Sequence, residues 1–324
     1  MSRVYTITLN PAIDHTVTVE HIVPGAVHRA RGQQLEAGGK GVGVASVLAA
    51  LGVPVTASGW LGADNDRLFV QTFAARGIAD GMVRVPGSTR TNIKLADLQR
   101  GDTTDINLPG VTLTGPALAD ARQALAGRLE ADVQSGDWCE LAGSLPPGAD
   151  AGVWLDLAQR LQQRGAHLVV DVAGATLRAV LDGWAAQVSA TQGPALIKPN
   201  RAELEELLGR ELPDAASLAA AADALRARGV QRVVVSLGGE GALIAGPEGR
   251  WLAQPPRVPV ATTVGAGDAL VGGAIAALRD GLAFPDAAVF GMACAAARIQ
   301  RIEPTLPPVA DVRALAAQVV LTPL

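Results

Sequence analysis

Short apolar runs alternate with segments of helical length along most of the chain. The runs are rich in Val, Leu and Ile, and most lack polar alternation, which is typical of strands buried on both faces. We expect strands at residues 4–9, 55–60, 138–142, 168–172, 196–198 and 233–237, and helices at 42–51, 118–129, 153–164, 202–208, 217–227 and 269–278. Strands that alternate with helices predict an α/β fold, with a mostly parallel sheet covered on both faces.

Two segments, at about residues 12–36 and 88–110, break this rhythm. Both are polar, and residues 91–98 alternate at period two, as a half-exposed strand does. We expect antiparallel strands here that extend from the parallel sheet as a small lid. Because no linker, repeat or low-complexity tract divides the chain, residues 1–324 are predicted to form one domain carrying this lid.

Composition narrows the class of function. The chain has 324 residues, of which 49% are hydrophobic, 18% charged and 3% aromatic, and its net charge is −4. This composition is typical of a globular protein, and it provides neither the basic surface nor the aromatic platforms of a nucleic-acid-binding protein.

Cysteine usage and hydropathy favour a cytoplasmic protein without a membrane span. Cys139 and Cys294 are far apart and belong to no CxxC pair, as expected of buried residues in a reducing compartment. The first residues read as a strand and not as a signal peptide. Residues 41–63 carry no charge, but Gly52 and Pro54 interrupt them, so we predict a helix, a turn and a strand.

Residues 262–268, Thr-Thr-Val-Gly-Ala-Gly-Asp, carry the clearest candidate chemistry. They lie between a β-like run at 257–261 and the helix expected at 269–278. A strand that turns through glycines into a helix leaves free N–H groups that suit a phosphate. Asp268 adds a carboxylate in the first turn, so donors for a phosphoryl group and a base for a hydroxyl would lie together. The alternative is that Asp268 only complements the helix dipole.

A second glycine-rich segment, residues 38–41, precedes another predicted helix. Its glycines would let a ligand approach the backbone, and Lys40 would supply charge. It is not a Walker A motif, because Gln34 and Gly41 occupy two defining positions. The alternative is a flexible turn.

Two further strand ends carry polar or glycine-rich sequences. Asn200 and Glu203 have the spacing of a capping box, and their oxygens would also suit a water-bound Mg²⁺ next to Lys198. Residues 236–241 could cradle a nucleotide phosphate or ribose, or could form a tight turn.

Three charged residues near the lid are candidates for sugar recognition. Asp14 could accept hydrogen bonds from sugar hydroxyls, or could form an Asx turn. Arg90 and Lys94 could bind a substrate phosphate, although a solvated charge is the usual alternative for each.

Taken together, these segments resemble the ribokinase-like (PfkB) family of sugar kinases, and most closely its branch of 1-phosphofructokinases and tagatose-6-phosphate kinases. The resemblance rests on nine segments in register: residues 8–14, 37–41, 89–94, 104–107, 142–148, 171–174, 198–200, 236–238 and 263–268. It implies a three-layer α/β/α fold with a small β lid, and commonly a homodimer.

The resemblance also implies a role for each candidate residue. Asp268 would be the catalytic base, with Gly265, Ala266 and Gly267 as the anion hole. The sugar phosphate would be bound by Asp14, Gly38, Gly39, Lys40, Gly43, Arg90, Asn92, Asn107 and Ser144. ATP would be bound by Lys198, Asn200, Ser236, Leu237, Gly238, Gly239, Glu240, Gly241, Thr263 and Gly267. Asn200 and Glu203 would hold Mg²⁺ through water.

Three positions depart from the family pattern. Gly43 stands where related enzymes usually carry Asn, so that a polar contact to the substrate would be missing, replaced by water or accompanied by a changed sugar preference. Ala173 replaces a common Ser. The residues after Ala297 lack the small-residue pattern expected near adenine.

The leading expectation is therefore ATP- and Mg²⁺-dependent phosphorylation of fructose 1-phosphate to fructose 1,6-bisphosphate. Tagatose 6-phosphate, fructose 6-phosphate or a nucleoside are alternative substrates, although Arg90 and Lys40 favour a phosphorylated sugar. A catalytically silent sensor of sugar phosphate or nucleotide is the alternative from a different class. The Gly43 departure suggests it, and the complete 265–268 segment argues against it.

Overall fold

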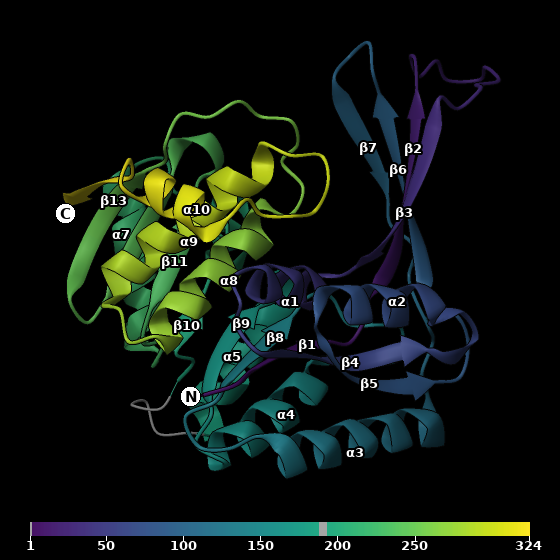
Figure 1. Cartoon of the computed structure of the whole chain (residues 1–324). Helices are drawn as coiled ribbons and strands as arrows, with labels where there is room; N and C mark the ends of the chain where they lie inside the picture. The colour runs from purple at the N-terminus through teal and green to yellow at the C-terminus, as the bar shows by residue number, and fades with distance from the viewer. Residues whose placement is uncertain (1, 188–192) are drawn as a thin grey trace.

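The computed structural model describes residues 2–187 and 193–324 (Figure 1). Within them, ten strands form one sheet in the order β14-β13-β12-β11-β10-β9-β8-β1-β4-β5. These strands are β1 (Val4–Thr8), β4 (Val55–Gly62), β5 (Ala79–Val85), β8 (Trp138–Ala142), β9 (His167–Asp171), β10 (Leu196–Ile197), β11 (Val233–Ser236), β12 (Ala242–Gly246), β13 (Gly249–Gln254) and β14 (Val320–Pro323). The strands from β11 to β5 are parallel, and β12, β13 and β14 continue the sheet in antiparallel pairs.

Side chains of the central strands are buried on both faces of the sheet. In β1, Tyr5 and Ile7 belong to one hydrophobic cluster, whereas Val4 belongs to the other. Because successive side chains point to opposite faces, each central strand places apolar side chains on both faces of the sheet. Helices must therefore cover each face. This confirms the three-layer α/β/α prediction.

Helices cover both faces of the sheet (Figure 1). The first cluster includes residues of α3 (Gly115–Asp132), α4 (Ala151–Gln163), α5 (Gly174–Gln187), α6 (Arg201–Leu208) and α7 (Ala215–Ala227). The second includes residues of α1 (Lys40–Ala50), α2 (Arg67–Arg76), α8 (Ala266–Arg279) and α9 (Phe284–Ile299), and α10 (Val309–Ala316) packs on α9. Apart from the β-like run at 257–261, each helix and strand expected from the sequence is present, with bounds that shift by a few residues.

One expected extended segment is absent. Residues 257–261 form no strand, so the β-like run before the glycine turn was a wrong prediction. Pro256 and Pro259 cannot donate ladder hydrogen bonds, and most of this segment is exposed. Its last residue instead donates a hydrogen bond from Ala261 N to Ile299 O at 2.8 Å, which ties it to the end of α9.

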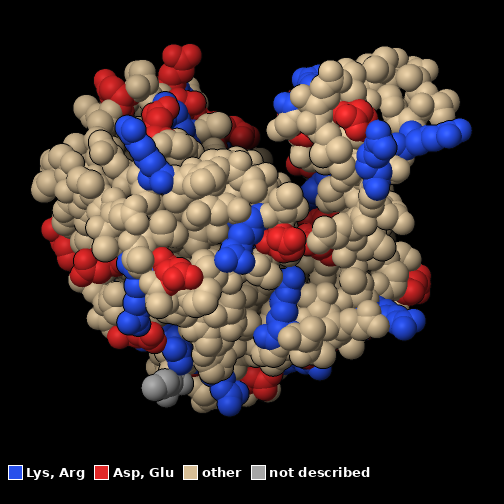
Figure 2. All heavy atoms as spheres, turned by 45° about the horizontal axis from the view of Figure 1, so that its top comes forward, with Lys and Arg blue, Asp and Glu red and all other residues tan. Residues whose placement is uncertain are grey.

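A second sheet of four strands projects from the body of the molecule (Figures 1 and 2). Its order is β3 (Gly32–Gly38), β2 (Ala12–Val19), β6 (Arg90–Asp97) and β7 (Asp102–Ile106). The outer pairs are antiparallel, as expected, but β2 and β6 are parallel, which corrects the prediction of antiparallel strands only. The reason is that β2 follows β1 and β6 follows β5 along the chain. Since β1 and β5 run in the same direction in the large sheet, β2 and β6 leave it in the same direction.

Among the residues that the structure describes, no helix combines the length and apolarity required to cross a membrane.

Candidate active site

The carboxyl ends of the parallel strands bring the predicted segments together. Asn10 follows β1, Ser144 follows β8, Asp171 ends β9 and Lys198 follows β10. Asn10 Nδ2 donates to Ser144 Oγ at 3.2 Å, which joins two of these ends directly. Ligands of α/β sheets bind at this edge, so the fold places the candidate residues where a site is expected.

The N-terminus of α8 provides free donors at this edge. Gly265 is the N-cap with φ 79°, a left-handed conformation that favours glycine. Among the described residues, the backbone N–H groups of Gly267 and Asp268 have no hydrogen-bond partner, and Ala266 N makes only a long bond of 3.4 Å to Thr263 O. The helix dipole and these N–H groups can therefore receive an anion.

Asp268 lies among these donors and is half-buried. Burial, followed by the nearby Asp171 carboxylate, raises the pKa of its carboxyl to about 7, although Lys40, Lys198 and Lys94 act in the opposite direction. A carboxyl group with a pKa near neutrality can exchange a proton at physiological pH.

Gly43 faces Asp268 across the contact between α1 and α8. A Cβ atom at position 43 would lie 2.1 Å from Asp268 Oδ2, which is far inside van der Waals contact. The departure from Asn at this position therefore has a structural consequence, because the carboxylate occupies space that a side chain would fill. The sequence suggested only a lost substrate contact.

A buried cluster of charges lies beneath the site. Asp171 Oδ1 is 3.0 Å from Lys40 Nζ and 3.6 Å from Lys198 Nζ. Burial alone would raise the pKa of Asp171, but the two ammonium groups hold it below its usual value. Glu140 in β8 is fully buried, and neither of its carboxyl oxygens has a partner among the described residues. Burial and the charges of Asp171 and Asp268 raise the pKa of Glu140 well above its usual value, which favours its protonated form.

A cleft of about 850 Å³ opens between the second sheet and the body. Its lining includes the predicted sugar-phosphate residues Gly39, Lys40, Arg90, Asn107 and Ser144, together with Ala173 and Glu203. The guanidinium of Arg90 donates to three carbonyl oxygens, of Asn10 at 2.9 Å, Leu108 at 2.8 Å and Pro11 at 3.4 Å. These bonds use three of its five N–H groups, so one N–H on each Nη atom has no hydrogen-bond partner among the described residues and could donate to a phosphate.

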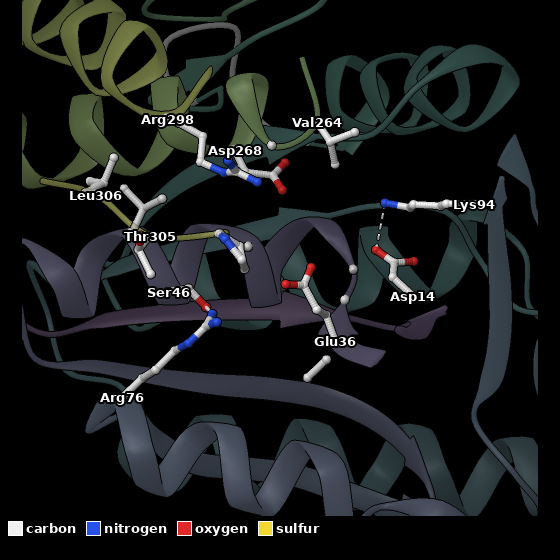
Figure 3. A pocket seen from close by; sticks show the side chains of 17 residues that line it. Asp14, Glu36, Ser46, Arg76, Lys94, Val264, Asp268, Arg298, Thr305 and Leu306 are labelled. Carbon is white, nitrogen blue, oxygen red and sulfur yellow. Dashed lines mark hydrogen bonds and ion pairs between the residues drawn. The ribbon is translucent and has the colours of Figure 1, made fainter. Parts of the chain in front are cut away.

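A smaller cavity of about 90 Å³ lies on the other side of Gly39 (Figure 3). It brings Asp268 together with the predicted residues Asp14, Gly38, Gly39 and Gly43, and with Lys94. Lys94 Nζ lies 3.0 Å from Asp14 Oδ2, the contact drawn as a dashed line in Figure 3. The predicted substrate residues thus divide between two adjoining cavities that share Gly39.

Asn92 has a different place from the one predicted. It is buried, its Nδ2 donates to Asp14 Oδ1 at 3.3 Å, and its Oδ1 accepts from Leu108 N at 3.2 Å. It lines neither of these two cavities. Its observed contacts hold Asp14, so a direct contact of Asn92 with substrate lacks support.

The third cavity, a cleft of about 850 Å³, lies on the other side of the α8 N-terminus. Its lining includes the predicted nucleotide residues Ser236, Gly238, Gly239, Glu240, Gly241, Thr263 and Gly267. Leu237 packs instead against the hydrophobic core, and residues 236–241 also form the tight connection between β11 and β12. The tight turn is therefore confirmed, and nucleotide binding by this segment stays a prediction.

Apolar walls of this cleft were not foreseen from the sequence. They comprise Val258, Val260, Leu270, Met292, Ala295, Ala296 and Ile299. The small residues of α9 lie before Ala297, whereas the small-residue pattern near adenine was expected after Ala297. The run of small residues at 293–297, Ala-Cys-Ala-Ala-Ala, was the signal that could have located this wall.

Asn200 and Glu203 form the capping box that their spacing predicts. Asn200 Oδ1 accepts from Glu203 N at 2.8 Å, and Glu203 Oε2 accepts from Asn200 N at 2.9 Å. Lys198 is buried beside them and lies 3.6 Å from the position of a Cβ at Gly267, so it faces the α8 N-terminus.

Comparisons with known proteins agree with this geometry. The sequence model of one family, described as "pfkB family carbohydrate kinase", matches residues 7–310. The chain is 42% identical over 322 residues to the 1-phosphofructokinase of Rhodobacter capsulatus, covering 99% of this chain and 98% of that protein. It is 46% identical over 275 residues to the 1-phosphofructokinase of Xanthomonas campestris pv. campestris, covering 85% and 84%.

Solved structures show the same fold. Phosphofructokinase-2 from Escherichia coli in complex with potassium superposes with a TM-score of 0.88 at 30% identity, covering 98% of this chain and 99% of that chain. A possible 1-phosphofructokinase from Thermotoga maritima gives a TM-score of 0.85 at 27% identity, covering 99% of both chains.

The contact between Gly43 and Asp268 yields a prediction. Gly43→Ala should displace the Asp268 carboxylate or separate α1 from α8, and we expect a loss of about 1–3 kcal/mol in the free energy of unfolding. Gly127→Ala is a matched control, because Gly127 also lies within a helix but a Cβ there has open space. The control should gain up to about 1 kcal/mol from helix propensity. Denaturant unfolding measures both, and equal gains in the two variants would contradict the contact.

Proposed function

The chain belongs to the pfkB family of carbohydrate kinases, and on that premise we propose that it phosphorylates fructose 1-phosphate. The γ-phosphoryl group of ATP would pass to the C6 hydroxyl, giving fructose 1,6-bisphosphate and ADP. One observation carries this proposal: Asp268, with its pKa near neutrality, lies at a helix N-terminus that separates two cavities on one side from a third on the other. Similarity to 1-phosphofructokinases supports the choice of sugar.

Asp268 would act as the general base. Its ionised carboxylate would accept the proton of the C6 hydroxyl while that oxygen attacks phosphorus in line with the leaving ADP oxygen. The N–H groups of Gly265, Ala266 and Gly267 would donate to the oxygens of the transferring group, where negative charge is concentrated. A helix N-terminus suits this role without rearrangement.

ATP fits the cleft lined by residues 236–241 and α9. Its volume of about 850 Å³ lies within the usual range for ligand sites. Met292, Ala296 and Val260 provide an apolar slot for a base, and the glycines of residues 238–241 allow phosphate or ribose to approach the backbone. Lys198, at the Gly267 side, would compensate phosphate charge.

Mg²⁺ fits Asn200 and Glu203 only through water. Both side chains are engaged in the capping box, and Glu203 Oε1 remains free to accept a hydrogen bond from a water ligand. Among the described residues, no cluster of three or more His, Cys, Asp or Glu side chains could coordinate a metal directly. Bound Mg²⁺ would neutralise charge on the phosphates.

The phosphate already on the sugar would lie in the cleft with Lys40, Asn107 and Ser144. Arg90 would join them through the N–H groups that its three carbonyl partners leave unused. We propose that the second sheet acts as a lid over this cleft, because β6 carries Arg90 and β2 carries Asp14. Closure would exclude water from the transfer.

A direct assay tests the proposed function. ADP release with Mg-ATP should give a kcat/KM for fructose 1-phosphate at least about tenfold above the values for fructose 6-phosphate, tagatose 6-phosphate and unphosphorylated fructose. Preference for another sugar would support the kinase activity but would change the assigned substrate. Gly43 would then be the first residue to examine. Thermal stabilisation by these ligands without any ADP would indicate the silent sensor.

Asp268→Asn tests the base in two independent ways. We expect kcat to fall by about 10²–10⁴-fold while the sugar still binds, and wild-type kcat to fall as pH drops below about 7. The raised pKa of Asp268 also contributes stability that is present at low pH and lost as pH rises through about 7. This loss begins above the ordinary aspartate pKa, so the stability advantage of the variant over wild type should be larger at pH 8 than at pH 5. Unchanged turnover would remove the assignment.

The Mg²⁺ proposal can be separated from helix capping. Asn200→Ala and Asp214→Ala each remove a capping-box residue, the second from α7, and each should cost about 1 kcal/mol of stability. Only Asn200→Ala should raise the Mg²⁺ concentration needed for half-maximal activity. Equal Mg²⁺ dependence in the two variants would leave Asn200 with a capping role alone.

We also propose a homodimer in the cytoplasm, joined through the second sheet. Large apolar side chains are exposed on or near it, including Leu35, Leu98, Ile106 and Leu108. Both cysteines are free and buried, as suits a reducing compartment. The molar mass from light scattering should be twice that of one chain. The double variant Leu35→Lys and Ile106→Lys should have the molar mass of one chain. A wild-type monomer at assay concentration would contradict the dimer.

A further inference from the structure

Arg298 is a buried cation that the mechanism above does not use. It lies in the last turn of α9, and only 6% of its surface is exposed. Its Nη1 donates to Arg301 O at 2.6 Å, and this is the single hydrogen bond of its side chain among the described residues. No carboxylate of those residues lies within ion-pair distance of it. Burying a guanidinium without a charged partner costs free energy. A function of Arg298 would explain why this buried charge and its other N–H donors are present.

The position of Arg298 connects it to the α8 N-terminus. Its Nε is 3.1 Å from where a Cβ of Gly265 would lie, so the guanidinium packs directly against the N-cap of α8. It also lines the small cavity that contains Asp268 and Gly43. In Figure 3 the side chain extends from α9 toward the Asp268 carboxylate, while Glu36 points into the cavity from the opposite side.

The charges around Asp268 come from every element that surrounds it. They are Asp171 of β9, Lys40 of α1, Lys198 after β10, Lys94 of β6 and Arg298 of α9, with Asp14 of β2, Glu36 of β3 and Arg76 of α2 in the same cavity. The titratable carboxyl of Glu140 in β8 is buried nearby. Lys40 and Lys198 already face Asp171, and Lys94 faces Asp14. Arg76 donates to Ser46 Oγ at 2.7 Å. Arg298 is therefore the cation of this set that has neither a carboxylate nor a side-chain partner among the described residues.

We propose that Arg298 is a positioning residue for phosphoryl transfer: it places a fixed positive charge behind the Gly265 turn. This inference rests on the proposed kinase function. The charge stabilises the ionised form of Asp268 and the negative charge that the α8 N-terminus receives. Arginine suits this position because it stays charged when buried.

A structural role is the alternative. The bond to Arg301 O could simply fix the chain after α9, and a cation in the last turn complements the helix dipole. Arg279 is a matched control for that role. It occupies the last turn of α8, its side chain is 7% exposed, and its Nε donates to Ser2 O at 2.6 Å, at the end of α8 opposite Asp268.

The test compares Arg298→Ala, Arg298→Lys and Arg279→Ala, using fructose 1-phosphate and Mg-ATP. We expect Arg298→Ala to lower kcat by about 10–100-fold and to move the acidic limb of the kcat–pH profile upward by about 0.5–1 unit, because Asp268 loses a neighbouring cation. With Arg298→Lys, most of the kcat and the position of the acidic limb should return to the wild-type values. Added guanidinium should partly restore the kcat of the alanine variant. Arg279→Ala should lower the Tm. Its kcat should stay within about twofold of wild type, and the acidic limb of its kcat–pH profile should stay within about 0.2 pH unit.

An Arg298→Ala enzyme with an unmoved pH limb and a kcat within twofold of wild type would overturn the inference. If the alanine variant fails to fold, Arg298→Lys and Arg298→Gln decide, since only the glutamine variant should show the shifted limb. An inactive wild-type enzyme would instead remove the proposed function, so the two failures are distinguishable.

Discussion

The site depends on how the charges of two carboxylates, Asp171 and Asp268, are balanced at one edge of the sheet. Lys40 and Lys198 face Asp171 and hold its pKa low, so it remains ionised. Burial and that ionised neighbour raise the pKa of Asp268 to about 7. The two carboxylates thus divide their roles: one is a permanent charge that fixes two lysines, and the other is available to exchange a proton.

Placement of these groups follows from the parallel sheet. Because β1, β8, β9, β10 and β11 all end at the same edge, short segments distant in sequence meet there. The α8 N-terminus enters this edge through Gly265 and separates the cleft that suits ATP from the cavities that suit a sugar phosphate. Gly43 then leaves room for the Asp268 carboxylate, and Arg298 packs behind the turn. These two positions shape the environment of the Asp268 carboxylate.

Much of this arrangement could be predicted from the sequence, because periodicity locates buried strands and glycine turns mark their ends. The capping box at Asn200 followed from spacing alone. The strand expected at 257–261 was wrong, since prolines there prevent ladder bonding. The parallel pairing of β2 with β6 depends on how distant segments cross, which local pattern does not encode. Glu140, Arg298 and the steric role of Gly43 were missed for the same reason, since each acquires its meaning only from neighbours remote in sequence. The nine segments that resemble the PfkB family supplied the roles of the others.

The most direct measurement is a crystal structure with fructose 1-phosphate, Mg²⁺ and a non-hydrolysable ATP analogue. We predict the C6 hydroxyl oxygen within about 2.6–3.2 Å of an Asp268 carboxylate oxygen. The sugar phosphate should lie beside Lys40, and the nucleotide in the cleft of residues 236–241. A sugar bound with its phosphate against Asp268, or a nucleotide outside that cleft, would contradict the account.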